Sequence, residues 1–172
     1  MNDFFAGLDV STQGQKIVVI DLQKNSVIYS DSINYDLDLP KYSTLNGVIR
    51  DTETGVSESS PKMWIDALHL IFERLKTSSD IIQSIKAISI AGQQHGLVAI
   101  DIDGNLAKPT SKLWNDFSTL EECEILTKEI GGSDQMIHAV ANSQRTGYTA
   151  SKIFHMYRNE RELYEKTDYF LL

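Results

Sequence analysis

Three short apolar runs separated by polar connections make up the beginning of the chain. Phe4–Val10 and Lys16–Leu22 are rich in strand-forming residues, and Ser26–Tyr35 alternates roughly between apolar and polar positions. The connections Ser11–Gln15 and Lys24-Asn25 are short and consist of small or polar residues. The pattern therefore predicts three antiparallel strands joined by tight turns.

A helical period follows a long irregular stretch. Residues 36–60 contain proline, glycine and a Ser/Thr/Glu-rich segment, which together predict a surface loop. Ser60-Pro61 then predicts a helix start, with Ser60 as N-cap and proline in the first turn. Apolar residues recur at about helical spacing as far as Lys76, namely Trp64, Leu68, Phe72 and Leu75.

Strands and helices alternate in the rest of the chain. Ile85–Ala91 predicts a buried strand, and Leu97–Ile102 predicts another that ends in a turn at Asp103-Gly104-Asn105. Helices are expected over about 119–130, 134–140 and 149–158, the first capped by Ser118 and ended by Gly131-Gly132. A last strand begins at Asp168. The fold class predicted is α/β with a mixed sheet flanked by helices.

Composition narrows the class of protein. The formal net charge of −8 argues against a nucleic-acid surface, which needs a basic stripe, but leaves phosphate binding through backbone N–H groups open. Cys123 is the only cysteine, so an intramolecular disulfide is excluded. No apolar run approaches the roughly 18 residues of a membrane span, and the N-terminus lacks a basic leader segment. We expect a cytoplasmic protein that binds neither nucleic acid nor membranes.

The first candidate site is the turn between the first two predicted strands. Gly7–Gly14 places Asp9 at a strand end and Thr12 and Gln13 in a hydroxyl- and glycine-rich hairpin, which Lys16 follows. Turn amides and hydroxyls can bind phosphate oxygens, and a carboxylate can hold Mg²⁺ through water. The GxxxxGK[ST] pattern of a Walker A loop does not occur. Composition alone favours the plainer alternative, in which these residues only form a turn.

Three later segments also carry clustered polar side chains. Gly92–Gly96 offers two glutamines and His95 at a strand end, groups that suit polyol recognition. Trp114-Asn115-Asp116 combines a ring that can stack on a sugar with two polar side chains. Ser143–Lys152 contains the donor fork of Arg145, and its Thr149 could cap a helix. The structural alternatives are a solvated loop histidine, a core tryptophan before an Asx turn, and a plain helix N-terminus.

The order of these segments carries more information than any one of them. GLDVSTQG, AGQQHG, LWND and TGYTASK resemble, in this order and at these intervals, the motifs of FGGY carbohydrate kinases. That family typically shows a GIDxGT-like hairpin, a GQxHG loop, an LWND segment and a GFTAPK-like helix start. The resemblance runs from Gly7 to Leu172 and is closest to the xylulose kinases. Gln94, where many xylulose kinases carry Met, and Ser151, where Pro is usual, leave the exact sugar open.

The resemblance implies a ribonuclease-H-like domain of the actin and hexokinase fold, and residues 1–172 would be the N-terminal, sugar-binding domain. In this family ATP and sugar meet in a cleft between two domains. Asp9 would organise Mg²⁺ and the β- and γ-phosphates of ATP. The other nucleotide contacts would come from Thr12, Gln13, Gly14 and Lys16. The sugar contacts would come from Gln94 and His95, with Asp116 and Arg145 as further candidates.

The reaction implied by the resemblance is transfer of the γ-phosphate of ATP to a sugar hydroxyl, turning D-xylulose into xylulose 5-phosphate. The general base of the family is an Asp in a GGGDN-like motif, and neither this motif nor the adenosine-binding motif occurs here. We therefore expect the C-terminal domain that bears the ATP site and the base to be missing, and the 172-residue chain alone to be inactive.

Other functions fit the same residues. One alternative is a noncatalytic sugar-sensing domain that keeps the kinase fold, and another is a kinase for a different pentulose or polyol. A glycerol kinase is disfavoured, because glycerol kinases typically carry an Arg-Glu pair in the region of Gly92–Gly96. The sequence leaves the oligomeric state open, a homodimer included.

Overall fold

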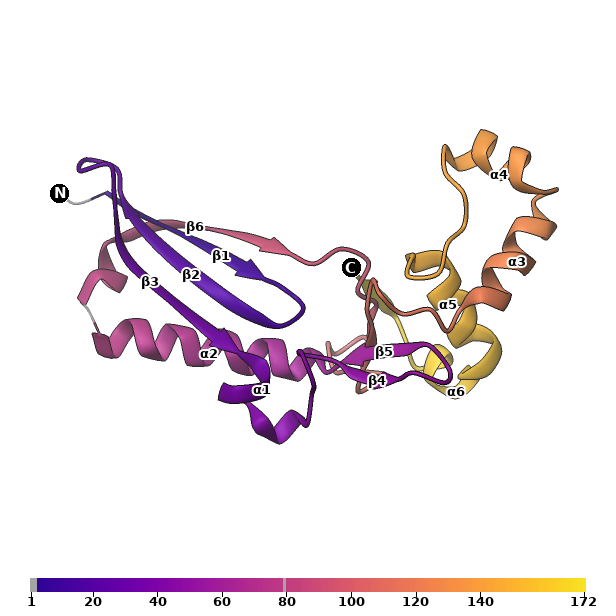
Figure 1. The fold of residues 1–172 in the computed structure, drawn as a ribbon, viewed down its shortest axis with the longest axis horizontal. Helices are drawn as coiled ribbons and strands as arrows, with labels where there is room; N and C mark the ends of the chain where they lie inside the picture. The colour runs from indigo at the N-terminus through magenta and orange to yellow at the C-terminus, as the bar shows by residue number, and fades with distance from the viewer. Residues whose placement is uncertain (1–2, 79) are drawn as a thin grey trace. The chain divides into compact units, whose positions relative to one another are not determined.

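The structure is a computed structural model that describes residues 3–78 and 80–172. The chain divides into two compact units (Figure 1). Unit 1 comprises residues up to Val48 together with Ser60–Gln93, and unit 2 comprises Ile49–Ser59 together with Gln94–Leu172.

Unit 1 is built on a four-stranded sheet with the order β3-β2-β1-β6. Its strands are β1 (Phe4–Val10), β2 (Gly14–Asp21), β3 (Ser26–Asn34) and β6 (Ile85–Gly92). The pairs β1–β2 and β2–β3 are antiparallel, and β1–β6 is parallel. The predicted three-strand meander and the mixed sheet are both confirmed.

Helix α2 (Pro61–Ser78) covers one face of this sheet and begins at the predicted proline. The residues of its most buried line are Met63, Ala67, Ile71 and Leu75, which recur every fourth position. The predicted stripe through Trp64, Leu68 and Phe72 is therefore displaced by one residue, and these three side chains are only partly buried. The predicted stripe is displaced because small Ala67 is fully buried in the core of unit 1. A search for large apolar residues does not include an alanine.

Strand β6 lies at the edge of the sheet, next to β1. The strand is confirmed, but its predicted burial is wrong, because Ile88 and Ile90 are 46% and 63% exposed. A short 3-10 helix, η2 (Asp80–Ser84), precedes it.

The long loop predicted over residues 36–60 is wrong, because this region contains four short elements. They are α1 (Tyr35–Asp38), the 3-10 helix η1 (Pro40–Tyr42), β4 (Ile49–Asp51) and β5 (Val56–Ser59). Strands of three and four residues are too short for a periodic signal, and β5 is held by pairing with β4 and with a strand distant in sequence. Inside unit 1, the Asp36 carboxylate fixes the turn over residues 44–47 by accepting hydrogen bonds from the Thr44 hydroxyl and from the N–H groups of Asn46 and Gly47.

Unit 2 contains two small antiparallel sheets. One has the order β4-β5-β8, with β8 at Ser111–Lys112, and the other pairs β7 (Val98–Ile100) with β9 (Tyr169–Leu171). The predicted turn after β7 is confirmed, since Asp101 N–H donates to the carbonyl of Asn105 at 2.9 Å.

Four helices complete the described part of unit 2, namely α3 (Leu120–Glu129), α4 (Ser133–Val140), α5 (Thr149–Asn159) and α6 (Arg161–Glu165). The predicted caps are wrong, since Thr119 and Tyr148 occupy the N-cap positions of α3 and α5. The Ser118 hydroxyl instead donates to Asp116. None of the helices in the described part of the chain has the length and apolar character of a membrane span.

Candidate functional site

Asp9 lies at the end of β1, on the face of the sheet opposite the core. Phe4, Ala6 and Leu8 alternate with it and are buried, whereas Asp9 is exposed. In the antiparallel register Asp9 is opposite Lys16 of β2, which is exposed too. Directly opposed residues project from the same face, so the two predicted nucleotide-site charges share an open surface.

The hairpin between β1 and β2 is held by backbone bonds from both sides. Ser11 donates to the carbonyl of Gly14 through its N–H at 2.9 Å and its hydroxyl at 3.0 Å. From the other side, Tyr35 N–H donates to the carbonyl of Gln13 at 3.1 Å, and its hydroxyl donates to the carbonyl of Ser11 at 3.3 Å. Tyr35 is fully buried, and burial raises the pKa of its phenol to about 12, with a further contribution from the Asp9 charge.

Gly47 closes the hairpin from the turn that Asp36 organises. It has a φ of +75°, and a Cβ at this position would lie 2.0 Å from the carbonyl oxygen of Thr12. Only glycine allows this approach. Part of the region predicted as loop therefore supports the hairpin that carries Thr12, Gln13 and Gly14.

Gln93 is one of the two glutamines recognised in Gly92–Gly96, but the sequence reasoning gave it no role in the site. Its N–H donates to the carbonyl of Val10 at 3.1 Å, and its side-chain oxygen accepts the Thr12 hydroxyl at 3.1 Å. It joins the end of β6 to the hairpin after β1. The signal for it was its place between the predicted strand and Gln94, but only the parallel pairing of β1 with β6 gives it this partner.

In unit 2, His95 stands in an unusual backbone conformation. Its φ is +59°, in the left-handed region that favours glycine. The imidazole stacks on the ring of Tyr148, with centroids 4.8 Å apart and planes 29° from parallel. His95 is half-buried, whereas Gln94 beside it is exposed. The stack orients the imidazole and argues against a freely solvated loop histidine.

Asp116 is fully buried, and both of its carboxylate oxygens are engaged. Oδ2 accepts Ser57 N–H at 2.8 Å and lies 3.4 Å from Lys112 Nζ. Oδ1 accepts the N–H of Ser118 at 3.1 Å and its hydroxyl at 2.6 Å. The bond to the Ser118 N–H is an Asx turn, as one alternative anticipated, and this arrangement suits a structural carboxylate better than a direct sugar ligand.

Trp114 and Gly147 lie where two of the motifs touch. Trp114 is 51% exposed, so the alternative of a core tryptophan is wrong. Gly147 has a φ of +84°, and a Cβ there would lie 2.0 Å from the carbonyl oxygen of Trp114. The TGYTASK and LWND segments are therefore in backbone contact. Arg145 is exposed, and its Nε donates to the Ser143 hydroxyl at 3.3 Å.

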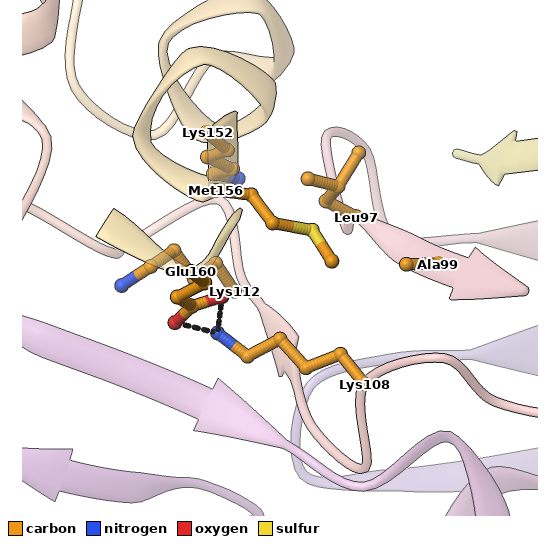
Figure 2. A pocket seen from close by; sticks show the side chains of 7 residues that line it. All are labelled: Leu97, Ala99, Lys108, Lys112, Lys152, Met156 and Glu160. Atoms are coloured by element: carbon orange, nitrogen blue, oxygen red, sulfur yellow. Dashed lines mark hydrogen bonds and ion pairs between the residues drawn. The ribbon is translucent and has the colours of Figure 1, made fainter. Parts of the chain in front are cut away.

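A cluster of largely buried charges includes Lys108, Lys112 and Glu160, which line the small cavity drawn in Figure 2. Lys108 Nζ lies 2.7 Å from Glu160 and 3.2 Å from Glu58, and Lys112 Nζ lies 3.5 Å from Glu58. Burial opposes the charged form of Glu58, but the Thr110 hydroxyl bond and the two lysines outweigh it and lower its pKa. Burial likewise opposes the charge of Lys108, but its glutamates outweigh it and raise its pKa. These pairs keep the cluster ionised.

The predicted residues divide between the two units. The hairpin set in unit 1 consists of Asp9, Thr12, Gln13, Gly14 and Lys16. The loop set in unit 2 consists of Gln94, His95, Asp116 and Arg145. Within the described residues, no group of three or more His, Cys, Asp or Glu side chains could enclose a metal ion.

Comparison with known proteins decides the family. The family model described as "FGGY family of carbohydrate kinases, N-terminal domain" matches residues 4–172, almost the whole chain. The chain belongs to the FGGY family of carbohydrate kinases. It is 38% identical to the xylulose kinase of Schizosaccharomyces pombe over 95% of its own length and 32% of that protein's. It is 29% identical to the xylulose kinase of Rattus norvegicus over 94% of its length and 34% of the relative's. The chain thus spans about a third of these relatives.

Solved structures confirm the predicted fold class. A xyloylose kinase from Brucella ovis superimposes with a TM-score of 0.81 at 27% identity, over 98% of this chain and 32% of that one. A gluconate kinase from Lactobacillus acidophilus gives 0.80 at 22% identity over 99% of this chain and 31% of that one. Kinases named for different sugars therefore share this fold almost equally, and the fold does not identify the sugar.

Proposed function

We propose that this FGGY chain forms the N-terminal, sugar-binding part of an ATP-dependent kinase that phosphorylates D-xylulose. The observation that carries the proposal is the 38% identity to the Schizosaccharomyces pombe xylulose kinase, which extends over 95% of the chain. Phosphoryl transfer depends on positioning and charge neutralisation, and the motifs of this chain would contribute to both.

The hairpin set would bind the phosphates of Mg²⁺-ATP. An exposed carboxylate at a strand end fits Mg²⁺, which keeps most of its waters and takes one or two carboxylates together with substrate phosphates. Asp9 would hold the hydrated ion, while Thr12, Gln13, Gly14 and Lys16 would contact the nucleotide. The bound ion would neutralise charge on the phosphates. Tyr35 and Gly47 support this assignment, because they fix the hairpin backbone in advance of binding.

The loop set would bind the sugar. The stacked imidazole of His95 can donate or accept a hydrogen bond at a sugar oxygen, and exposed Gln94 offers both kinds of group. Arg145 is exposed and could reach a ligand oxygen. Asp116 would act indirectly, without contacting the sugar, by fixing the segment that carries the exposed Trp114 ring.

The test is an ADP-release assay on the product of the complete gene. The acceptors are D-xylulose, L-xylulose, D-ribulose, gluconate and glycerol. We expect D-xylulose to give the highest kcat/KM of these acceptors. A higher kcat/KM for another acceptor would contradict the proposed sugar. His95→Ala should lower kcat/KM for the sugar roughly 3- to 100-fold and leave the KM for ATP unchanged. The matched control is His138→Ala, since His138 is an exposed histidine of α4.

The 172-residue chain alone should release no ADP above the enzyme-free rate, because it carries no GGGDN-like motif. Turnover that scales with its concentration would contradict this. If the gene product binds sugar but turns over no acceptor, the sugar-sensing alternative holds instead. A cytoplasmic location and a homodimer stay predictions.

A further inference from the structure

Lys152 is a buried lysine on α5 that the proposed reaction does not use. Its side chain is 1% exposed, and its Nζ donates to the backbone carbonyl of His95. Figure 2 shows it on the wall of a small cavity formed by Leu97, Ala99, Lys108, Lys112, Met156 and Glu160. We propose that Lys152 is a positioning residue that holds the loop around His95 in its left-handed conformation.

The conformation of His95 requires such support. A non-glycine residue at a φ of +59° costs free energy and persists only where its surroundings determine it. Two contacts from the start of α5 meet at His95: the ring of the N-cap residue Tyr148 stacks on its imidazole, and Lys152, four residues later, binds its carbonyl. Tyr148 fixes the side chain and Lys152 fixes the backbone.

Lys152 differs from the other lysines of the cavity in its partner. Lys108 and Lys112 each form ion pairs with carboxylates, whereas no ion pair of Lys152 is found among the residues that the structure describes. Burial, opposed by the Asp116 charge and reinforced by that of Lys112, lowers the pKa of Lys152 to about 8. A lysine selected only for stability would gain more from a carboxylate partner. The cost of burying this ammonium therefore points to the backbone bond as its role.

The consequence for catalysis rests on the proposed function, in which His95 contacts the sugar. If Lys152 sets the loop, its loss should raise the KM for the sugar with little change in the KM for ATP. The loop geometry itself can be measured without any substrate, so a failure of one idea can be told from a failure of the other.

The experiment compares Lys152→Met with Lys108→Met in the 172-residue chain by NMR. Both substitutions replace a cavity lysine by an apolar side chain of similar length, but only the first removes the bond to His95. We expect the His95 ring protons, shifted by the Tyr148 ring, to move towards random-coil positions in Lys152→Met and to stay in place in Lys108→Met. Unchanged His95 signals in Lys152→Met, or equal changes in both variants, would overturn the proposal.

A titration keeps the test decisive if Lys152→Met does not fold. The His95 carbonyl carbon of the unmodified chain should shift as the pH rises through the Lys152 pKa of about 8, because a neutral amine is a weaker donor than an ammonium. Lys152→Arg, which stays charged, should abolish that step. The other charged groups around Lys152, namely Asp116, Lys112, Lys108 and Glu160, are present in both proteins. A step that persists in Lys152→Arg would overturn the proposal.

Steady-state kinetics of the complete gene product test whether Lys152 affects sugar use. Lys152→Met should raise the KM for D-xylulose roughly tenfold or more, as expected for the loss of a hydrogen bond from a charged donor. Partial recovery in Lys152→Arg would support positioning. If the His95 signals move but the KM for the sugar does not, Lys152 positions the loop and the sugar role proposed for His95 is wrong.

Discussion

The hairpin of unit 1 and the loop region of unit 2 present polar side chains by different means. Tyr35, only 24 positions from Ser11, binds two backbone carbonyls of the hairpin, and Asp9 projects from the hairpin into the open. The loop region depends on buried charges that join distant positions, such as Asp116 to Ser57 and Lys152 to His95. Each nevertheless depends on a glycine at which two backbones meet, Gly47 against the hairpin and Gly147 in the loop region.

This difference predicts which substitutions should lower activity alone and which should lower stability. An exposed side chain on a self-supporting hairpin can be changed without loss of the fold, whereas a buried charge cannot be removed without cost to its neighbours. The chain provides its own reporters, since its two tryptophans are Trp64 in unit 1 and Trp114 in unit 2. A Trp64→Phe or Trp114→Phe background allows the unfolding of each unit to be followed by fluorescence.

The largest effect is expected from Asp9→Asn in the complete gene product. Loss of a charge that organises the metal should lower kcat by roughly three decades or more, about 4 kcal/mol of transition-state stabilisation. Because Asp9 is exposed, the thermal midpoint of unit 1 should not change. The measurement is kcat beside a melt followed by Trp64. Near-normal kcat would show that Asp9 is only a turn residue.

The buried counterpart is Asp116→Asn, and it should act on stability first. The amide keeps the shape but removes the charge that binds the Ser57 N–H, both Ser118 donors and Lys112. We expect the free energy of unfolding of unit 2 to fall by about 3 kcal/mol, the scale of a broken buried pair. Urea unfolding monitored at Trp114 measures it.

The matched control for Asp116 is Asp103→Asn, in an exposed turn of the same unit, which should change stability by less than about 0.5 kcal/mol. Equal effects of the two substitutions would show that the burial of Asp116 contributes nothing.

Much of unit 1 could be predicted from the sequence, because its signals are local. The strands β1 to β3 follow from apolar runs and turn residues, and the start of α2 follows from Ser60-Pro61. Strand β5 could not be found in this way, since it has only four residues and its pairing of Glu58 with Lys112 of β8 joins two segments of unit 2 that are distant in sequence. The core line of α2 was displaced because Ala67 carries little hydrophobic signal.

The same limit applies to the candidate site. All four motif segments could be found, because clustered polar residues after strands stand out in a sequence. The functions of individual side chains could not. The contacts that define Asp116 and Lys152 join positions 59 and 57 residues apart, and Gln93 gains its partner Thr12 across 81. A polar residue in a motif gives no sign of whether it faces a ligand or a buried neighbour.

Gly147→Ala sharpens the comparison by testing the backbone contact in unit 2. The new Cβ would meet the Trp114 carbonyl at 2.0 Å and would also sit at a φ of +84°. Gly104→Ala is the matched control, since Gly104 has a φ of +82° and no atom within 4 Å of a Cβ. The control should lose about 1 kcal/mol of unfolding free energy, and Gly147→Ala about 2 kcal/mol or more. Equal losses would mean that the contact with Trp114 yields easily.

The smallest effect is expected from Tyr35→Phe, which removes one neutral hydrogen bond beneath the hairpin of unit 1. The bond from its hydroxyl to the Ser11 carbonyl is 3.3 Å long, so unit 1 should lose about 1 kcal/mol of unfolding free energy at neutral pH. Tyr29→Phe, a half-buried tyrosine of β3, is the control and should lose less.

The loss in Tyr35→Phe should also depend on pH. The folded state raises the pKa of Tyr35 from 10.0 to about 12, so the folded chain retains this proton where the unfolded chain releases it. The stabilisation is therefore complete below pH 10 and disappears as the pH rises from 10 to about 12. The difference in unfolding free energy between the two proteins, followed at Trp64, should shrink across that window. Because Tyr42, whose pKa is also raised to about 12, is present in both proteins, its titration cancels in the difference. A difference that stays constant up to pH 12 would show that the Tyr35 phenol is not held neutral beneath the hairpin.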